Sequence, residues 1–184
     1  MSESVSAALK QLLTTPQSAE LGPGPRDGVQ SAKKLEEAMA GVFASSKLPP
    51  VTQQLIRAVI LLWHDHLDAA HSISQDIETP DGSLVHAIMH RREPDYWNAK
   101  YWWRRAGNHP CFPELARRVA DFLKARNESQ LAHKLIPNGD WDAFAFVDAC
   151  EAAADKNANA QLLREIQQIE TEVALDHFLG VEAR

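Results

Sequence analysis

Histidines and carboxylates recur at helical spacing in two neighbouring segments of the chain. On a continuous helix, four polar residues of the first segment would form one stripe, at i, i+4, i+7 and i+11: His64, Asp68, His71 and Gln75. In the second segment, His86, His90 and Glu93 lie at i, i+4 and i+7. Two imidazoles and a carboxylate on one helix face can present ligands to zinc, iron or manganese and leave positions for water. This pattern indicates a metal-activated hydroxide or an oxygenase-type centre.

The same part of the chain is rich in histidine and tryptophan. Six of the eight histidines and four of the five tryptophans lie between positions 63 and 109. However, the chain has no HExxH sequence and no pair of CxxC sequences, so it carries no standard zinc signature. The alternative is a buried hydrogen-bond network between helices, or a solvated polar face. The candidate metal ligands are His64, His71, His86, His90 and Glu93.

A basic segment follows the second histidine stripe. Residues 91–118 contain seven basic and three acidic side chains, a net charge of +4, so the rest of the chain carries −10. Arginine forks suit carboxylate or phosphate, and neighbouring aromatic rings can stack on a planar ligand. The alternative is that the arginines near helix ends interact favourably with the helix dipoles. The further candidate ligand-binding residues are Arg91, Arg92, Asp95, Asn98, Lys100, Tyr101, Arg104 and Arg105.

Composition bounds the class of protein. The chain has 184 residues, is 45% hydrophobic and 24% charged, and carries a net charge of −6, which is typical of one soluble globular domain. Its acidic balance makes nucleic-acid binding unlikely, and two cysteines do not make a disulfide scaffold. We expect no signal peptide and no membrane span, and hence a cytoplasmic protein. A homo-oligomer is compatible with these properties.

Apolar spacing predicts a single all-α domain, because no segment alternates with the period of a strand. An N-terminal helix and a Gly/Pro-rich connector, GPGPRDG at its core, occupy residues 1–30. The connector is not a phosphate-binding loop, since Pro23 and Pro25 lack the backbone donors that such a loop uses. A TPDG turn is expected at 79–82. The predicted helices are 4–14, 31–46, 51–77, 83–93, 95–107, 113–126, 141–154 and 159–179.

Residues 51–110 predict two antiparallel helical hairpins that carry the polar site. Small and aromatic residues alternate there at the spacing of a tetratricopeptide hairpin: Ala87, Tyr96, Ala99, Trp103 and Ala106. Ala58, Leu67 and Ala70 occupy three of the same positions 29 residues earlier. A tetratricopeptide-like pair and a generic antiparallel bundle both explain this spacing.

The blocks WHDHLDAAH and HAIMHRREPDYWNAKYWWRRAGNHP resemble a family of small, uncharacterised all-helical proteins of bacteria and fungi. The resemblance covers about residues 63–110, with WDAFAFVD at 141–148 as a weaker block. It implies that the polar stretch forms one unit, and it brings no activity with it.

Two functional hypotheses follow, together with a structural alternative. The first is a helical-hairpin protein that binds a small anionic ligand or a peptide terminus in a pocket lined by His, Arg and Trp. The second is a metal-dependent, hydrolase-like enzyme that uses the same His, Asp and Glu side chains. The third is an interaction protein with an exposed tryptophan patch. A cysteine nucleophile is not favoured, because His109 and Cys111 stand two residues apart in a loop with proline between them.

Overall fold

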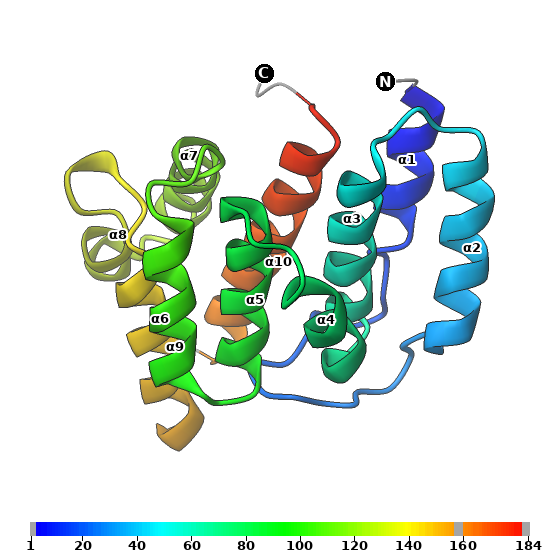
Figure 1. Ribbon diagram of the computed structural model, residues 1–184. Coiled ribbons are helices and arrows are strands. Elements are labelled where there is room, and N and C mark those ends of the chain that lie inside the picture. The colour runs from blue at the N-terminus through cyan, green and yellow to red at the C-terminus, as the bar shows by residue number, and fades with distance from the viewer. Residues whose placement is uncertain (1–2, 157–159, 182–184) are drawn as a thin grey trace.

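The computed structural model describes residues 3–156 and 160–181, and these residues form helices and no strand. The all-α prediction is confirmed. Figure 1 shows most of the helices running up and down side by side, with α5 and α10 near the centre, while α7 and α8 are seen nearly end-on. The bounds are α1 Glu3–Gln11, α2 Ala32–Ala44, α3 Pro50–Trp63, α4 Leu67–Ser74, α5 Pro80–Arg92, α6 Tyr96–Ala106, α7 Phe112–Lys124, α8 Ser129–Leu135, a 3₁₀ turn Pro137–Gly139, α9 Ala143–Lys156 and α10 Ala160–Phe178.

Side-chain caps fix where the central helices begin. The Thr79 hydroxyl accepts a hydrogen bond from the Gly82 N–H at 3.2 Å, and Pro80 occupies the first turn of α5. The TPDG sequence is therefore the cap and first turn of α5 rather than a separate turn, and the predicted start at residue 83 was wrong. Asp95 caps α6 by accepting from the Asn98 N–H at 3.2 Å.

The predicted continuous helix 51–77 is wrong, because the chain breaks between α3 and α4. Asp65 adopts the left-handed region with φ of 67°, which an uninterrupted right-handed helix does not allow. The buried Asp65 carboxylate accepts hydrogen bonds from Arg26 and Arg92, which holds the break in place. Helix α8 had no counterpart among the predicted helices.

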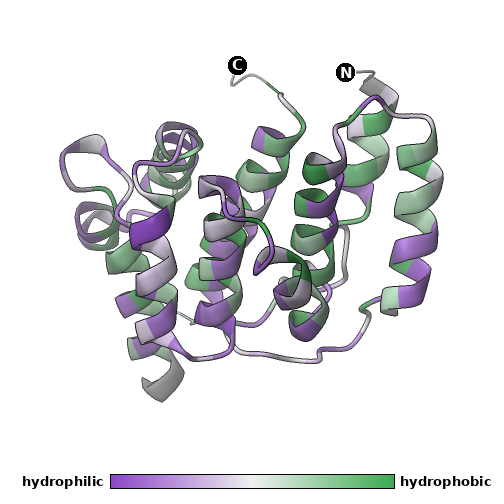
Figure 2. Ribbon diagram, in the orientation of Figure 1, coloured by the Kyte–Doolittle hydropathy of each residue, from purple (hydrophilic) through white to green (hydrophobic). Residues whose placement is uncertain are grey.

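Helix α5 lies at the centre of the molecule (Figure 1). It packs against α3, α4 and α6, while α10 packs against α3, α7 and α9. Every residue from Gly82 to Arg92 is buried, although Figure 2 shows hydrophilic and hydrophobic residues interspersed along this helix. Polar groups in a buried helix need partners inside the protein. Arg91 meets this need by pairing with Glu170, which joins α5 to α10.

The buried apolar side chains of the described helices form one continuous cluster, as expected for a single domain. Consecutive helices α5 and α6 make the most extensive helix–helix contact, and the small residues Ala87, Ala99 and Ala106 are all buried. This agrees with a close hairpin, whereas its assignment as tetratricopeptide-like stays a prediction. None of the helices in the described ranges is long and apolar enough to cross a membrane.

Candidate metal centre

Three imidazoles from two helices converge beside α5. His71 comes from α4, while His86 and His90 stand one turn apart on α5. One ring nitrogen of each lies within 4.8 Å of the others. The ring centroids are 4.8 Å apart for His71 and His86, 5.3 Å for His71 and His90, and 4.8 Å for His86 and His90. Three of the metal ligands predicted from the sequence therefore lie close together in the structure. We call these three residues the three-histidine cluster.

His86 is the most unusual member of the three-histidine cluster. Its side chain is buried, and neither ring nitrogen has a hydrogen-bond partner among residues 3–156 and 160–181. The ring stacks on Trp102 with centroids 3.9 Å apart. Burial, with His90 and His71 adding to it, lowers the pKa of His86 to about 3. The imidazole is therefore neutral near pH 7, which is the form that binds a metal ion.

His90 is oriented by two neighbours. Its Nδ1 lies 3.1 Å from Glu93 Oε2, and its Nε2 lies 3.1 Å from the Asn98 side-chain nitrogen. An Nδ1–H that donates to Glu93 leaves the Nε2 lone pair to accept from Asn98 or to bind a metal. Burial lowers the pKa of His90 and the Glu93 carboxylate opposes this shift. Glu93 is thus placed to orient a ligand through a histidine–carboxylate hydrogen bond.

His64 does not join the three-histidine cluster. The break at Asp65 separates it from α4, and its ring instead faces the N-terminal connector. Its Nδ1 accepts from the Gln30 N–H at 3.1 Å, and its Nε2 donates to the Leu12 carbonyl at 2.7 Å. Since both nitrogens contact backbone groups, the structure places His64 where it anchors the connector.

Arg91 and Arg92 are buried and bind protein atoms. Arg91 donates to both carboxylate oxygens of Glu170, one of them at 2.9 Å. Arg92 donates to Asp65 at 2.6 Å and to the backbone carbonyls of Glu20 and Gly22 at 3.2 and 3.1 Å. These guanidinium groups therefore serve as hydrogen-bond donors to buried carboxylate and carbonyl oxygens of the protein.

The remaining predicted residues lie at or near the surface. Asp68 and Gln75 are exposed on α4. On α6, Lys100 forms an ion pair with Asp148, and Tyr101 is 40% exposed. Arg105 lies over the Trp102 ring at 5.3 Å, so that an arginine, a tryptophan and His86 form a column. Of the other predicted residues, Asp95 caps α6, Asn98 contacts His90, and Arg104 lies over the Phe144 ring.

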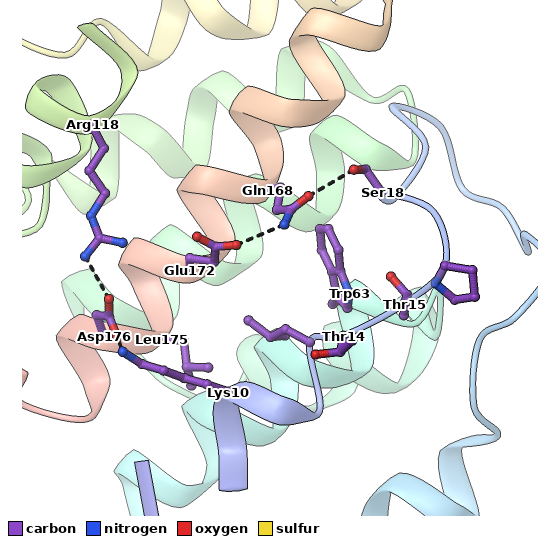
Figure 3. A pocket seen from close by; sticks show the side chains of 12 residues that line it. Lys10, Thr14, Thr15, Ser18, Trp63, Arg118, Gln168, Glu172, Leu175 and Asp176 are labelled. Carbon is purple, nitrogen blue, oxygen red and sulfur yellow. Dashed lines mark hydrogen bonds and ion pairs between the residues drawn. The ribbon is translucent and has the colours of Figure 1, made fainter. Parts of the chain in front are cut away.

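A cavity of about 450 Å³ lies elsewhere, between α1, α7 and α10 (Figure 3). Lys10 and Arg118 both contact Asp176, as the dashed line from Arg118 shows. Ser18 donates to Gln168, which in turn donates to Glu172. None of the site residues predicted from the sequence lines this cavity. The two cationic side chains that line the cavity, Lys10 and Arg118, already form ion pairs with Asp176 in the cavity wall.

The sequence analysis missed a second convergence of possible ligands, formed by Asp81, His109 and His177. These residues come from α5, the loop before α7 and the last turn of α10. They are separated by 28 and 68 positions, so no helical spacing connects them. Only the packing of α10 beside α5 and α7 brings them together.

The chain matches no protein-family model, and no curated protein or solved structure matches it.

Proposed function

We propose that the protein binds a divalent transition metal, such as zinc, iron or manganese, through His71, His86 and His90 and acts as a hydrolase-like metalloenzyme. The observation that carries the proposal is the buried His86 ring, whose two nitrogens have no hydrogen-bond partner in the described part of the chain although two other imidazoles stand beside it. An unpartnered buried polar group costs free energy that metal coordination would offset.

The donor set suits catalysis better than a purely structural site. Three protein ligands leave a coordination position for water, whose pKa the metal lowers, and this supplies a hydrolytic nucleophile near neutral pH. Tetrahedral ligands with Zn–N bonds of about 2.1 Å lie roughly 3.4 Å apart. The ring nitrogens are within 4.8 Å of one another, and the His86 and His90 rings stack at 16°, so metal binding would require the side chains to rotate until their nitrogens converge. His71 is only partly buried, so the open position would face the solvent side.

The protein residues around the cluster have separate roles in this proposal. Glu93 orients His90 through Nδ1, and Trp102 covers one face of His86. Such outer partners raise metal affinity by fixing ligand orientation. Asn98, which contacts His90 Nε2, has to give way before this nitrogen can bind a metal.

The anion-binding hypothesis has less support. It relied partly on Arg91 and Arg92, whose guanidinium groups donate to buried protein atoms. Lys100 is likewise paired, with Asp148. A small anion or a peptide terminus would have to displace these partners or use the exposed Arg104 and Arg105 of α6.

Metal content and affinity test the proposal. Tag-free protein is stripped with a chelator and titrated with Zn²⁺ in competition with a chromophoric chelator. We expect tight binding in the wild type, loss of that binding in His86→Leu, and wild-type affinity in His133→Gln, which removes an exposed histidine of α8. Equal zinc affinity in all three proteins would contradict the proposed site.

The enzymatic part has its own readout. The zinc-loaded protein should hydrolyse an activated aryl ester faster than the metal-free protein, and the His86→Leu variant should lose this difference. Zinc binding without any such rate difference would retain the metal site and reject the hydrolase.

A further inference from the structure

Asp81, His109 and His177 form a compact group on the side of α5 away from the three-histidine cluster. At 100° per residue, His86 and His90 lie about 140° and 180° around the α5 axis from Asp81. Asp81 Oδ1 lies 2.9 Å from His109 Nε2 and 3.0 Å from His177 Nε2. The two rings meet edge to face with centroids 4.9 Å apart. Three elements that are remote in sequence thus direct two nitrogens at one carboxylate.

The spacing of these atoms matches metal coordination. Neighbouring ligands of a six-coordinate metal with bonds of about 2.1 Å lie roughly 3.0 Å apart. Both measured O–N distances have this value. Two histidines and one carboxylate on one face are the donor set of facial non-haem Fe²⁺ sites, and nitrogen and oxygen donors also suit Mn²⁺.

His109 is held by a further contact. The side chain is fully buried, and its Nδ1 lies 3.3 Å from the Cys111 backbone nitrogen and 3.0 Å from Cys111 Sγ. These contacts aim Nε2 at Asp81. The Cys111 N–H donates to Nδ1, so the hydrogen of the neutral ring lies on Nε2 and is donated to Asp81. A metal bound at Nε2 would move this hydrogen to Nδ1, where the Cys111 sulfur would accept it in place of the N–H contact.

Exposure and charge also suit a site that exchanges ligands with solvent. The side chains of Asp81 and His177 are 36% and 29% exposed, whereas His109 is enclosed. The Asp81 carboxylate places a negative charge between the two imidazoles.

We infer that Asp81, His109 and His177 are a second metal centre, a facial two-histidine, one-carboxylate site for Fe²⁺ or Mn²⁺ that is separate from the three-histidine cluster. It does not depend on the proposed hydrolase. The competing explanation is a hydrogen-bond network that joins α5, α7 and α10 without metal.

Mn²⁺ titration of the metal-free full chain, followed by the electron paramagnetic resonance signal of free Mn²⁺, tests the inference. Asp81→Asn keeps an oxygen acceptor for both ring N–H groups but removes the charge, and His177→Gln changes a partly exposed ligand. We expect saturable binding in the wild type and a loss of at least about 10- to 100-fold in both variants, the range that loss of an outer partner already costs.

His71→Gln is the matched control, because it removes a ligand of the three-histidine cluster: any Mn²⁺ bound there should be lost, while the Mn²⁺ binding that Asp81→Asn and His177→Gln weaken should remain. Absence of saturable Mn²⁺ binding in the wild type, or equal affinity in the wild type, Asp81→Asn and His177→Gln, would overturn the inference in favour of the metal-free network. A loss in His71→Gln alone would assign the bound Mn²⁺ to the other cluster and would also overturn it. If Asp81→Asn does not fold, the His177→Gln comparison decides.

Discussion

Two buried polar clusters adjoin α5, and they differ in whether their atoms have partners. In the first, Asp65 Oδ1 accepts from Arg26 at 2.5 Å and from Arg92 at 2.6 Å, and further guanidinium donors reach backbone carbonyls. In the three-histidine cluster, both nitrogens of His86 lack a hydrogen-bond partner among the residues that the structure describes. Burial alone therefore does not separate a structural group from a functional one.

The difference shows what each cluster contributes to the protein. A buried ion pair whose donors are satisfied holds its elements together, and removal of one partner leaves an uncompensated charge. A buried imidazole without partners costs stability in the free protein, and this cost is recovered only when something binds it. Variants of the two clusters should therefore have opposite effects on stability and on metal binding.

The largest effect is expected for Asp65→Asn. The substitution tolerates the left-handed backbone but leaves Arg26 and Arg92 without their shared anion. The free energy of unfolding in urea should fall by about 3–5 kcal/mol, with the zinc affinity of the folded protein unchanged. Asp68→Asn is the control, because this exposed carboxylate should change stability by no more than about 0.5 kcal/mol. Similar stabilities for the two variants would remove the assigned role of the ion cluster.

A smaller effect is expected from zinc itself. Free Zn²⁺ at about 100 times its dissociation constant should add about 2.7 kcal/mol to the free energy of unfolding. His90→Gln should abolish most of this gain, since one of three ligands is lost, whereas His133→Gln should keep it. The measurement is urea denaturation with and without buffered zinc. Equal stabilisation of both variants would show that zinc binds elsewhere.

The next effect is expected for His86→Leu in metal-free protein. The substitution removes two buried nitrogens without hydrogen-bond partners, and a buried unpaired polar group costs about 1–3 kcal/mol of stability. It also removes the stacking contact with Trp102, which is worth about 0.5–1.5 kcal/mol. We expect a net gain of about 1 kcal/mol in chemical denaturation. A loss in stability comparable to that of Asp65→Asn would mean that His86 is a structural group.

The smallest effect concerns pH and His64. Burial lowers the pKa of this imidazole; the Leu12 contact and Asp65 oppose the shift, while Arg26 and His66 add to it. A lowered pKa means that the unfolded chain binds the proton more readily, so the stability is present above the unfolded pKa of 6.5 and is lost as pH falls below it. Urea unfolding at about pH 7.5 and about pH 5.5 should show a smaller loss in His64→Gln than in the wild type. The same loss in both proteins would assign the pH dependence to other groups.

Local sequence was sufficient for the helical class and for part of the site. Prolines mark the breaks between helices, and the four-residue step from His86 to His90 is a property of any helix. These features depend on neighbours in the chain. The predicted TPDG turn included the Thr79 cap, so the start of α5 was predicted three residues too late. His71, which the sequence analysis grouped with His86 and His90, lies beside them in the structure, on α4 rather than on the predicted continuous helix.

The break at Asp65 could not be predicted, because its partners Arg26 and Arg92 are 39 and 27 residues away. The availability of the basic residues in 91–118 could not be predicted either. Their net charge included Arg91 as a group free to bind a ligand, whereas Glu170, 79 residues later, accepts its hydrogen bonds. Long-range partners decide which polar residues are free, and a single sequence does not show them.

The connector between α1 and α2 takes much of its order from side chains of other segments. Arg92 donates to the carbonyls of Glu20 and Gly22, while the Arg26 and Gln30 amides donate to Asp65 and His64. Such a segment opens as one cooperative unit when the guanidinium and carboxylate groups separate. In native-state hydrogen exchange, the amide protons of Arg26 and Gln30 should therefore exchange together, through a local opening that leaves the protection of α5 intact.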